Sequence, residues 1–257
     1  MADACAAQGA GGPIDPAPWR TAAAQVLVED LTDPSLSTDD LHHLSRVLRL
    51  RAGVEVCAAD GRGGWRSTAF TGTAALDVQG DVRQQPSPEY PVTVGFALVK
   101  GDRPELVVQK LTELGVDRIV PFAARRSVVR WDEARAAKQM ERLRRVARES
   151  CGQCRRLWVP TVGTDDTDGA AVQLATFPQV HTPGAAIADA GGRPMRRSDR
   201  TILVGPEGGW DPSESDGADR IGIGEHVLRA ETAAIAVGVA LTALRVGLVT
   251  ETLETSP

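Results

Sequence analysis

The stretch Thr201-Ile-Leu-Val-Gly-Pro-Glu-Gly-Gly-Trp210 decides the fold class of this chain of 257 residues. A short apolar run ends in a glycine-rich loop, as a buried strand does at the carboxyl edge of a parallel sheet. A second glycine-rich loop, Ile221-Gly-Ile-Gly-Glu-His-Val-Leu-Arg-Ala-Glu-Thr232, opens an apolar segment of helical composition. Because glycines let a ligand approach the backbone, the two loops are predicted to converge on one ligand.

Strand and helix patterns alternate from Val92 onward, which predicts an α/β domain with a parallel sheet and helices on its faces. Strands are expected at 92–99, at 117–123, from 158–159, near residue 180 and at 201–204. Helices are expected at 103–114, 132–149, 169–176 and 230–250. The Gly184–Arg200 stretch is rich in glycine and basic residues, and this composition predicts a surface loop.

Shorter β-type segments precede residue 84, at 25–29, 54–58, 65–70 and 75–82, and predict a small β-barrel or sheet. Ser37 or Thr38 is the expected N-cap of a helix between the first two. Three prolines between Gln84 and Pro91 indicate a domain boundary. The predicted organisation is a loose extension at 1–20, a first domain at 21–84, a linker at 85–91 and a second domain at 92–251.

The composition of the chain argues against a membrane-spanning protein, a secreted protein and a disulfide-rich protein. No uncharged apolar run reaches the roughly 18 to 20 residues that cross a bilayer, and the first twenty residues lack the pattern of a secretory signal. Four scattered cysteines are too few for a disulfide framework, so a cytoplasmic protein is expected. The net charge of −5 argues against indiscriminate nucleic-acid binding, yet residues 100–158 hold fifteen Lys/Arg against eight Asp/Glu. That excess is either a solvated basic face or a phosphate-binding surface.

Several ligand chemistries are disfavoured by the motifs. The first glycine loop lacks the Lys-Ser/Thr pair of a phosphate-binding P-loop, and Gly222-Ile-Gly224 lacks the third glycine of a dinucleotide fingerprint. Cys151 and Cys154 have zinc-like spacing, but no second Cys/His pair accompanies them, so no metal is expected. His181 is interpreted as structural or ligand-lining. Because the P-loop and dinucleotide patterns are both incomplete, ATP and NAD are poor candidates for the ligand.

A set of ordered segments between Gln25 and Leu248 resembles the RsmE-type ribosomal RNA methyltransferases of the SPOUT superfamily. These segments are His43-Leu-Ser-Arg-Val-Leu-Arg49, Lys100-Gly-Asp-Arg103, Gln109-Lys-Leu-Thr-Glu-Leu-Gly115, Arg126-Ser-Val-Val129, Leu203-Val-Gly-Pro-Glu-Gly-Gly209 and Val227-Leu-Arg-Ala-Glu-Thr232. The resemblance implies a PUA-like β-barrel that helps to hold RNA, followed by a trefoil-knotted domain that binds S-adenosylmethionine. It also implies a homodimer that methylates N3 of a uridine in 16S ribosomal RNA, either naked or in the small ribosomal subunit. No local sequence pattern announces a knot.

The loops and the resemblance together give a hypothesis for each site residue. The expected cofactor-binding residues are Leu203, Val204, Gly205, Pro206, Glu207, Gly208, Gly209, Ile223, Gly224, Val227 and Leu228. The expected RNA-binding residues are Arg46, Arg49, Arg103, Arg126 and Arg130. Arg229 is the candidate for stabilising negative charge on uracil, and Glu231 is a candidate either for accepting a proton or for satisfying free N–H groups at a helix start.

The chain departs from the pattern of the family at three positions, where Gly152, Arg125 and His226 replace frequent Glu, Glu and Arg. RNA contacts and catalytic geometry are the features that these departures affect. An alternative function is a ribosome-assembly RNA-binding module that retains the cofactor site without significant catalysis. A third hypothesis, a nucleotide-dependent α/β enzyme, predicts binding of ATP or NAD instead of S-adenosylhomocysteine.

Overall fold

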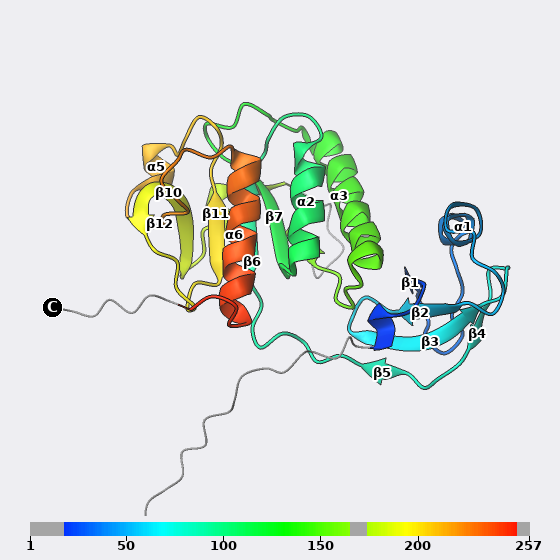
Figure 1. Ribbon diagram of the computed structural model, residues 1–257. Coiled ribbons are helices and arrows are strands. Elements are labelled where there is room, and N and C mark those ends of the chain that lie inside the picture. Colours follow the sequence, from blue (N-terminus) through cyan, green and yellow to red (C-terminus); the bar gives the residue numbers. More distant parts are fainter. Residues whose placement is uncertain (1–17, 165–173, 251–257) are drawn as a thin grey trace, which may run out of the picture. The chain divides into compact units, whose positions relative to one another are not determined.

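The computed structural model describes residues 18–164 and 174–250 (Figure 1). The contacts divide the chain into two units, and most of the predicted extension at 1–20 lies outside the described residues. The first unit holds the described residues up to Asp60 together with Trp65–Arg83. The second holds Gly61–Gly64 and the described residues from Gln84 onward. No helix in these ranges is long and apolar enough to cross a membrane.

The first sheet is built from short strands around a small apolar core. Its members are β1 (Ala24–Leu27), β2 (Glu55–Ala59), β3 (Gly64–Phe70), β4 (Leu76–Val78) and β5 (Arg83–Gln84). The helix α1 (Thr38–His42) begins where the Ser37 hydroxyl accepts a hydrogen bond from the Asp40 N–H at 3.1 Å, which confirms the predicted cap. A π-helical turn continues it over His43–Val47, and Leu44 packs into the core.

The second sheet is parallel and has the strand order β12-β10-β11-β6-β7-β8, with β9 also paired to β7. Its strands are β6 (Thr93–Ala97), β7 (Arg118–Ala123), β8 (Thr161–Val162), β9 (Ala175–Thr176), β10 (Ala185–Arg193), β11 (Thr201–Val204) and β12 (Asp219–Ile221). The helices are α2 (Arg103–Leu114), α3 (Glu133–Cys154), α4 (Phe177–Val180), α5 (Pro212–Ser215) and α6 (Ala230–Arg245). The predicted α/β class is therefore confirmed for this unit.

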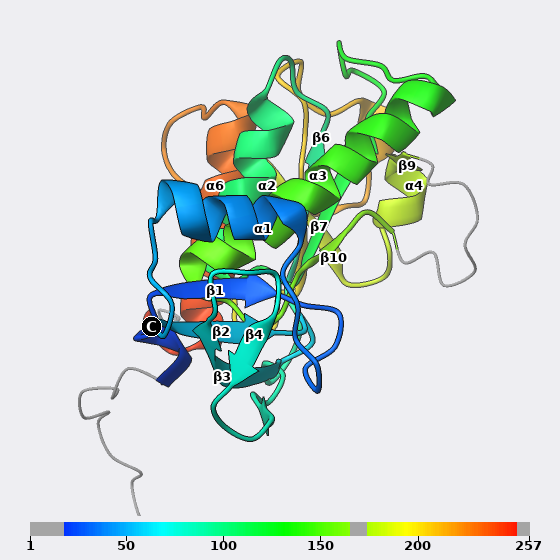
Figure 2. The ribbon, with the colours of Figure 1, turned by 90° about the vertical axis from the view of Figure 1, so that its right-hand side faces the viewer.

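The helices cover the two faces of this sheet unequally. Figures 1 and 2 show α2, α3 and α6 side by side on one face and the short α4 on the other. Alternation along the strands fills both layers, because Val94 and Phe96 pack toward the three long helices whereas Ala97 packs with α4 residues. A sheet covered on both faces explains the continuous apolar runs in its strands.

The prediction of a surface loop at Gly184–Arg200 is wrong over Ala185–Arg193, which forms β10 between β11 and β12. One of the glycines that suggested a turn, Gly192, serves close packing of strands instead. A Cβ on Gly192 would lie 2.6 Å from the backbone of Arg220 and Ile221, and the β10–β12 register shifts at this point. Glycine in a strand marks such a close approach or bulge.

Other element boundaries also differ from the predictions. The strand expected from Trp158 begins at Thr161, and Ala175–Thr176 is a strand where a helix was expected, although 169–173 lie outside the described residues. The helix α3 continues past Glu149 to Cys154 and ends at Arg155, whose φ of 62° is left-handed. The helix α6 stops at Arg245, shortly before Gly247 with a φ of +73°.

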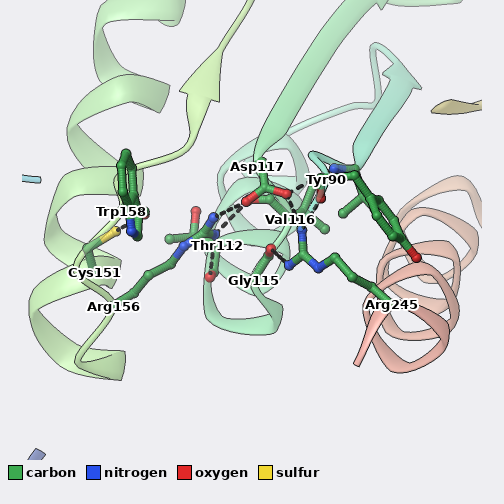
Figure 3. A network of polar contacts seen from close by, with 10 residues as sticks. Tyr90, Thr112, Gly115, Val116, Asp117, Cys151, Arg156, Trp158 and Arg245 are labelled. Carbon is green, nitrogen blue, oxygen red and sulfur yellow. Dashed lines mark hydrogen bonds and ion pairs between the residues drawn. The ribbon is translucent and has the colours of Figure 1, made fainter. Parts of the chain in front are cut away.

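A network of polar contacts at the amino edge of the sheet joins three helices (Figure 3). The Asp117 carboxylate accepts hydrogen bonds from Arg156 at 2.9 Å, from the Val92 N–H at 2.9 Å and from Arg245. Arg156 also donates to the Val116 carbonyl at 2.6 Å, while Arg245 donates to the Gly115 carbonyl at 2.8 Å. One carboxylate therefore ties the end of α2 to the segment after α3 and to the end of α6.

The cysteine pair beside this network lies in a helical and largely buried setting. Cys151 is buried on α3, with its Sγ 3.8 Å from the Trp158 carbonyl oxygen. Burial raises the pKa of the Cys151 thiol to about 12, and burial also raises the pKa of Cys154. Both thiols are therefore held in their unreactive protonated form.

We expect Cys151 to resist alkylation by iodoacetamide in the folded protein, because the thiolate is the reactive species. Mass spectrometry of the native and guanidinium-unfolded protein measures the difference. The unfolded thiol loses its proton above its ordinary pKa of 9.0, so the contribution of Cys151 to stability should fall as pH rises from there toward about 12. Equal labelling of Cys151 in the two states would contradict this.

Candidate active site

Four loops meet at the carboxyl edge of the second sheet. The strands β6, β7, β11 and β12 belong to one parallel sheet, so the segments that follow them leave from the same edge. These segments are Leu98–Asp102, Ala124–Asp132, Gly205–Asp211 and Gly222–Arg229. Ligands of α/β sheets bind at this edge, and both glycine-rich loops lie there.

The first glycine loop is fixed by packing beneath it. Leu203 is fully buried, and a Cβ on Gly95 of the neighbouring strand would lie 2.5 Å from its side chain. A Cβ on Gly205 would lie 2.8 Å from the Trp210 indole, so this position admits no side chain without a shift of the ring. Gly209 has a φ of +72° and no atom within 4 Å of its Cβ position, which leaves the loop backbone accessible.

An aromatic cluster on the face of the sheet that α4 covers supports this loop. The Trp210 indole stacks on Phe122 with an interplanar angle of 9°, meets Phe177 edge-on, and donates from Nε1 to the Ala188 carbonyl at 3.0 Å. The His181 ring stacks on Phe177 at a centroid distance of 5.0 Å. His181 thus has a packing role, whereas Trp210 is a residue of the site that the sequence analysis did not single out.

The second glycine loop is more exposed than the first. Ile223 packs against the core, whereas Val227 is 95% exposed and Leu228 37% exposed. Gly224 has no atom within 4 Å of its Cβ position. Arg229 is the N-cap of α6 and has an exposed side chain, with no carboxylate of the described residues paired to it. A cation is therefore free to meet a ligand at this loop.

Arg103 links the first glycine loop to the start of α6. It is the first residue of α2, and its Nη1 lies 3.6 Å from Glu207 Oε1 in the first loop. Its Nε lies 3.5 Å from Glu231 Oε1 in the first turn of α6. The side chain of Glu231 is 12% exposed, and its Oε2 is buried without a hydrogen-bond partner among the described residues. No helix N–H of the described residues donates to that oxygen.

The loop after β7 lies beside the first glycine loop. A Cβ on Gly208 would be 3.4 Å from the Arg126 carbonyl oxygen, and Arg126 Nε lies 3.4 Å from Asp211. Hydrogen bonds from Ser213, and then the charge of Arg126, lower the pKa of Asp211. The Arg125 N–H donates to the buried Glu214 at 2.8 Å. The sequence signal for this support is the capping box Asp-Pro-Ser-Glu at the start of α5.

The other predicted site residues lie in the first glycine loop, in the loop after β7 and on the first unit. Val204 is buried and offers only its backbone, and Pro206 follows in the first loop. Arg130 donates to the Arg125 carbonyl at 3.1 Å and lies in the same loop as Arg126. Arg46 and Arg49 are exposed on the first unit. The described residues contain no group of three His, Cys, Asp or Glu able to hold a metal.

Comparisons with known proteins identify the family. A model described as an RNA methyltransferase PUA domain matches residues 36–73, and one described as an RNA methyltransferase domain matches residues 85–242. Ribosomal RNA small subunit methyltransferase E of Bacillus subtilis is 30% identical over 80% of this chain and 88% of its own. The Synechocystis protein of that name is 31% identical over 77% of this chain and 69% of its own. The chain belongs to the ribosomal RNA small subunit methyltransferase E family.

Solved structures agree with this family. The small subunit methyltransferase E of Neisseria gonorrhoeae, bound to S-adenosyl methionine, is 23% identical with a TM-score of 0.68, covering 86% of this chain and 97% of that one. A Legionella pneumophila protein solved with bound SAM is 24% identical with a TM-score of 0.71, covering 85% and 96%. The predicted SPOUT fold with an N-terminal PUA domain is confirmed, while the knot remains a prediction.

Proposed function

We propose that this protein methylates N3 of a uridine in 16S ribosomal RNA with S-adenosylmethionine as the methyl donor. Membership of the methyltransferase E family supports the reaction. The single observation that carries the proposal is the bridge that Arg103 forms between Glu207 in the first glycine loop and Glu231 in the first turn of α6, which leaves Oε2 of Glu231 buried and unpaired among the described residues. Open backbone for the cofactor and an acceptor for a proton are thereby present at one edge of the sheet.

The residues of the site fit the cofactor. The Cβ positions of Gly209 and Gly224 have no atom within 4 Å, so a ligand can approach the backbone closely there. S-adenosylmethionine, when bound, supplies a methyl group attached to a positively charged sulfur. We assign its binding to the backbone of the two loops, over Leu203–Gly209 and Ile223–Leu228. The buried side chains of Leu203 and Val204 position the loop and leave its backbone as the binding surface.

Two side chains have roles in preparing the acceptor base. A uridine N3 carries a proton and is a poor nucleophile until that proton leaves. The free Oε2 of Glu231 is the proposed proton acceptor, because a buried carboxylate oxygen without a donor has an unused hydrogen-bonding capacity. The exposed guanidinium of Arg229, two residues earlier, is proposed to stabilise the negative charge that the uracil oxygens gain.

Basic side chains beside the site supply a surface for RNA phosphates. Arg126 and Arg130 lie in the loop that borders Gly208 and are proposed to contact RNA. The adjoining α3 continues this surface, because four exposed cations recur along it at helical spacing, namely Arg135, Lys138, Arg142 and Arg145. Arg46 and Arg49 are proposed to add contacts from the PUA domain. Arginine and lysine at such spacing suit a phosphate backbone.

We also propose a homodimer with the active site near the subunit interface. Support comes from large apolar side chains that are exposed on and after α6, namely Val239, Val246, Leu248 and Val249. Val227, almost fully exposed in the second glycine loop, is a further position for a partner to cover. The same proposal includes the trefoil knot and a cytoplasmic location beside the ribosomal RNA. It also includes a first domain at 21–84, a linker at 85–91 and a second domain at 92–251.

Transfer of tritium from labelled S-adenosylmethionine tests the function. Small ribosomal subunits and naked 16S RNA serve as parallel acceptors, and a melting shift with S-adenosylhomocysteine reports cofactor binding separately. We expect both a shift and incorporation into one of the two acceptors. A shift without incorporation would indicate the RNA-binding assembly module, and a shift with ATP or NAD alone would indicate a nucleotide-dependent enzyme.

Arg229→Ala is expected to reduce methyl transfer at least tenfold, equivalent to about 1.4 kcal/mol of transition-state stabilisation. The reason is the loss of a cation that stabilises charge on the base, at a position whose side chain supports no packing. Initial rates with saturating cofactor measure the effect. Arg197→Ala, which removes a cation at the opposite edge of the sheet, is the control. Unchanged turnover of the Arg229 variant would remove this residue from the mechanism.

A further inference from the structure

Arg103 has an environment that is unusual for a side chain expected to bind RNA. Its guanidinium lies between two carboxylates, with Glu207 of the first glycine loop at 3.6 Å and Glu231 of the first turn of α6 at 3.5 Å. Two negative groups beside one cation repel an approaching phosphate, and Arg103 would have to leave both in order to bind one. Contact with RNA is therefore a poor use of this residue.

Loss of the ion pair should affect Glu231 more than Arg103, because the Glu231 side chain is the less exposed of the two and Arg103 also pairs with Glu207. The carboxylate of Glu231 is mostly buried, and among the described residues Arg103 is the cation paired with it. Loss of one partner from a buried pair leaves an uncompensated charge, so a Glu231 carboxylate without Arg103 would turn toward water. The oxygen left free of Arg103, Oε2, would then lose its fixed position in the site.

We propose that Arg103 is a positioning residue that holds the Glu231 carboxylate at the start of α6, with Oε2 left outside the ion pair. The inference rests on the proposed role of Glu231 as proton acceptor. Glu207 completes the arrangement by fixing the other side of the guanidinium. Rotation of Glu231 is thereby restricted, and the same ion pairs keep the first glycine loop adjacent to the start of α6.

Steady-state kinetics of Arg103→Gln and Arg103→Lys separate positioning from RNA contact. Positioning predicts that Arg103→Gln lowers kcat at least tenfold while KM for RNA and its dependence on salt stay within about twofold of the parent protein. Arg103→Lys should recover part of kcat, since an ammonium keeps the charge but not both contacts. A raised KM with a weaker salt dependence and unchanged kcat would overturn the proposal in favour of an RNA contact.

A double-mutant cycle asks whether Arg103 acts through Glu231. In a Glu231→Gln background, Arg103→Gln should change kcat less than twofold. Thermal melting without RNA or cofactor gives a second readout, in which the double variant should lose less than the sum of the two single shifts. Arg197→Gln, which removes an exposed ion pair with Glu89, is the matched control. Additive effects in both kinetics and melting would overturn the proposal.

Different results would contradict the proposed methyltransferase function and the proposed positioning role of Arg103. If the parent protein transfers no methyl group while the melting shifts of Arg103→Gln and Glu231→Gln are coupled, the proposed function fails and the positioning contact stands. If the parent protein methylates RNA while the two variants show no coupling, the positioning role fails and the function stands.

Discussion

Replacing Glu231 by Gln is expected to reduce methyl transfer by about 100-fold or more, the usual contribution of a general base. The amide keeps the size of the side chain but cannot take the N3 proton of uridine. The structure supports this expectation because Glu231 is only 12% exposed and keeps one oxygen free while Arg103 holds the other. Cofactor binding should persist, since it is assigned to backbone groups of the loops.

Single-turnover methylation and the melting shift with S-adenosylhomocysteine measure the two consequences of Glu231→Gln separately. Glu113→Gln on α2, whose carboxylate pairs with Lys110 at 2.9 Å, removes the same charge away from the site and should retain full activity. A Glu231→Gln protein with undiminished turnover would show that the proton leaves by another route. A protein that no longer binds the cofactor analogue would instead make Glu231 part of the cofactor site.

Replacing Asp117 by Ala is expected to lower the free energy of unfolding by about 3–5 kcal/mol, the range for breaking a buried ion pair by removal of one partner. Arg156 and Arg245 would lose their shared carboxylate, and the Val92 N–H would lose its acceptor. All three charged side chains are 15% exposed or less, so water replaces little of the loss.

Urea unfolding of Asp117→Ala measures this change as a lower midpoint with an unchanged slope. Glu141→Ala, an exposed acidic position on α3, serves as the control and should shift stability by no more than about 0.5 kcal/mol. Because the network lies at the edge opposite the glycine loops, the folded variant should keep its cofactor affinity. A loss below about 1 kcal/mol would contradict a central role for Asp117.

The sequence predicted the local parts of the site better than their assembly. Both glycine loops and the helix start after Arg229 follow from short-range pattern, and the structure has them. The pairing of Arg103 with Glu207 and Glu231 joins residues more than one hundred positions apart, and no local pattern encodes it. The same holds for Asp117 and Arg245. Resemblance to a family supplied the reaction, which element patterns alone leave open.

The longest misassigned segment, Ala185–Arg193, has a physical origin for the error. The strand β10 consists largely of alanine and glycine, residues with weak strand preference, and its glycines imitate a turn. Gly192 is required where β10 and β12 approach closely, a condition that is visible only once both strands are placed. The aromatic support of Trp210 was missed for a similar reason, since Phe122 and Phe177 come from separate elements.

Mapping of methylated bases in 16S ribosomal RNA, after incubation with the protein and S-adenosylmethionine, tests the proposed function most directly. Mass spectrometry of RNA fragments distinguishes a methyl group on N3 of a uridine from one on a ribose or on another base. We expect N3-methyluridine at one site, strongly reduced with Glu231→Gln and Arg229→Ala. RNA without N3-methyluridine, or with the methyl group on a ribose oxygen, would contradict the proposed function.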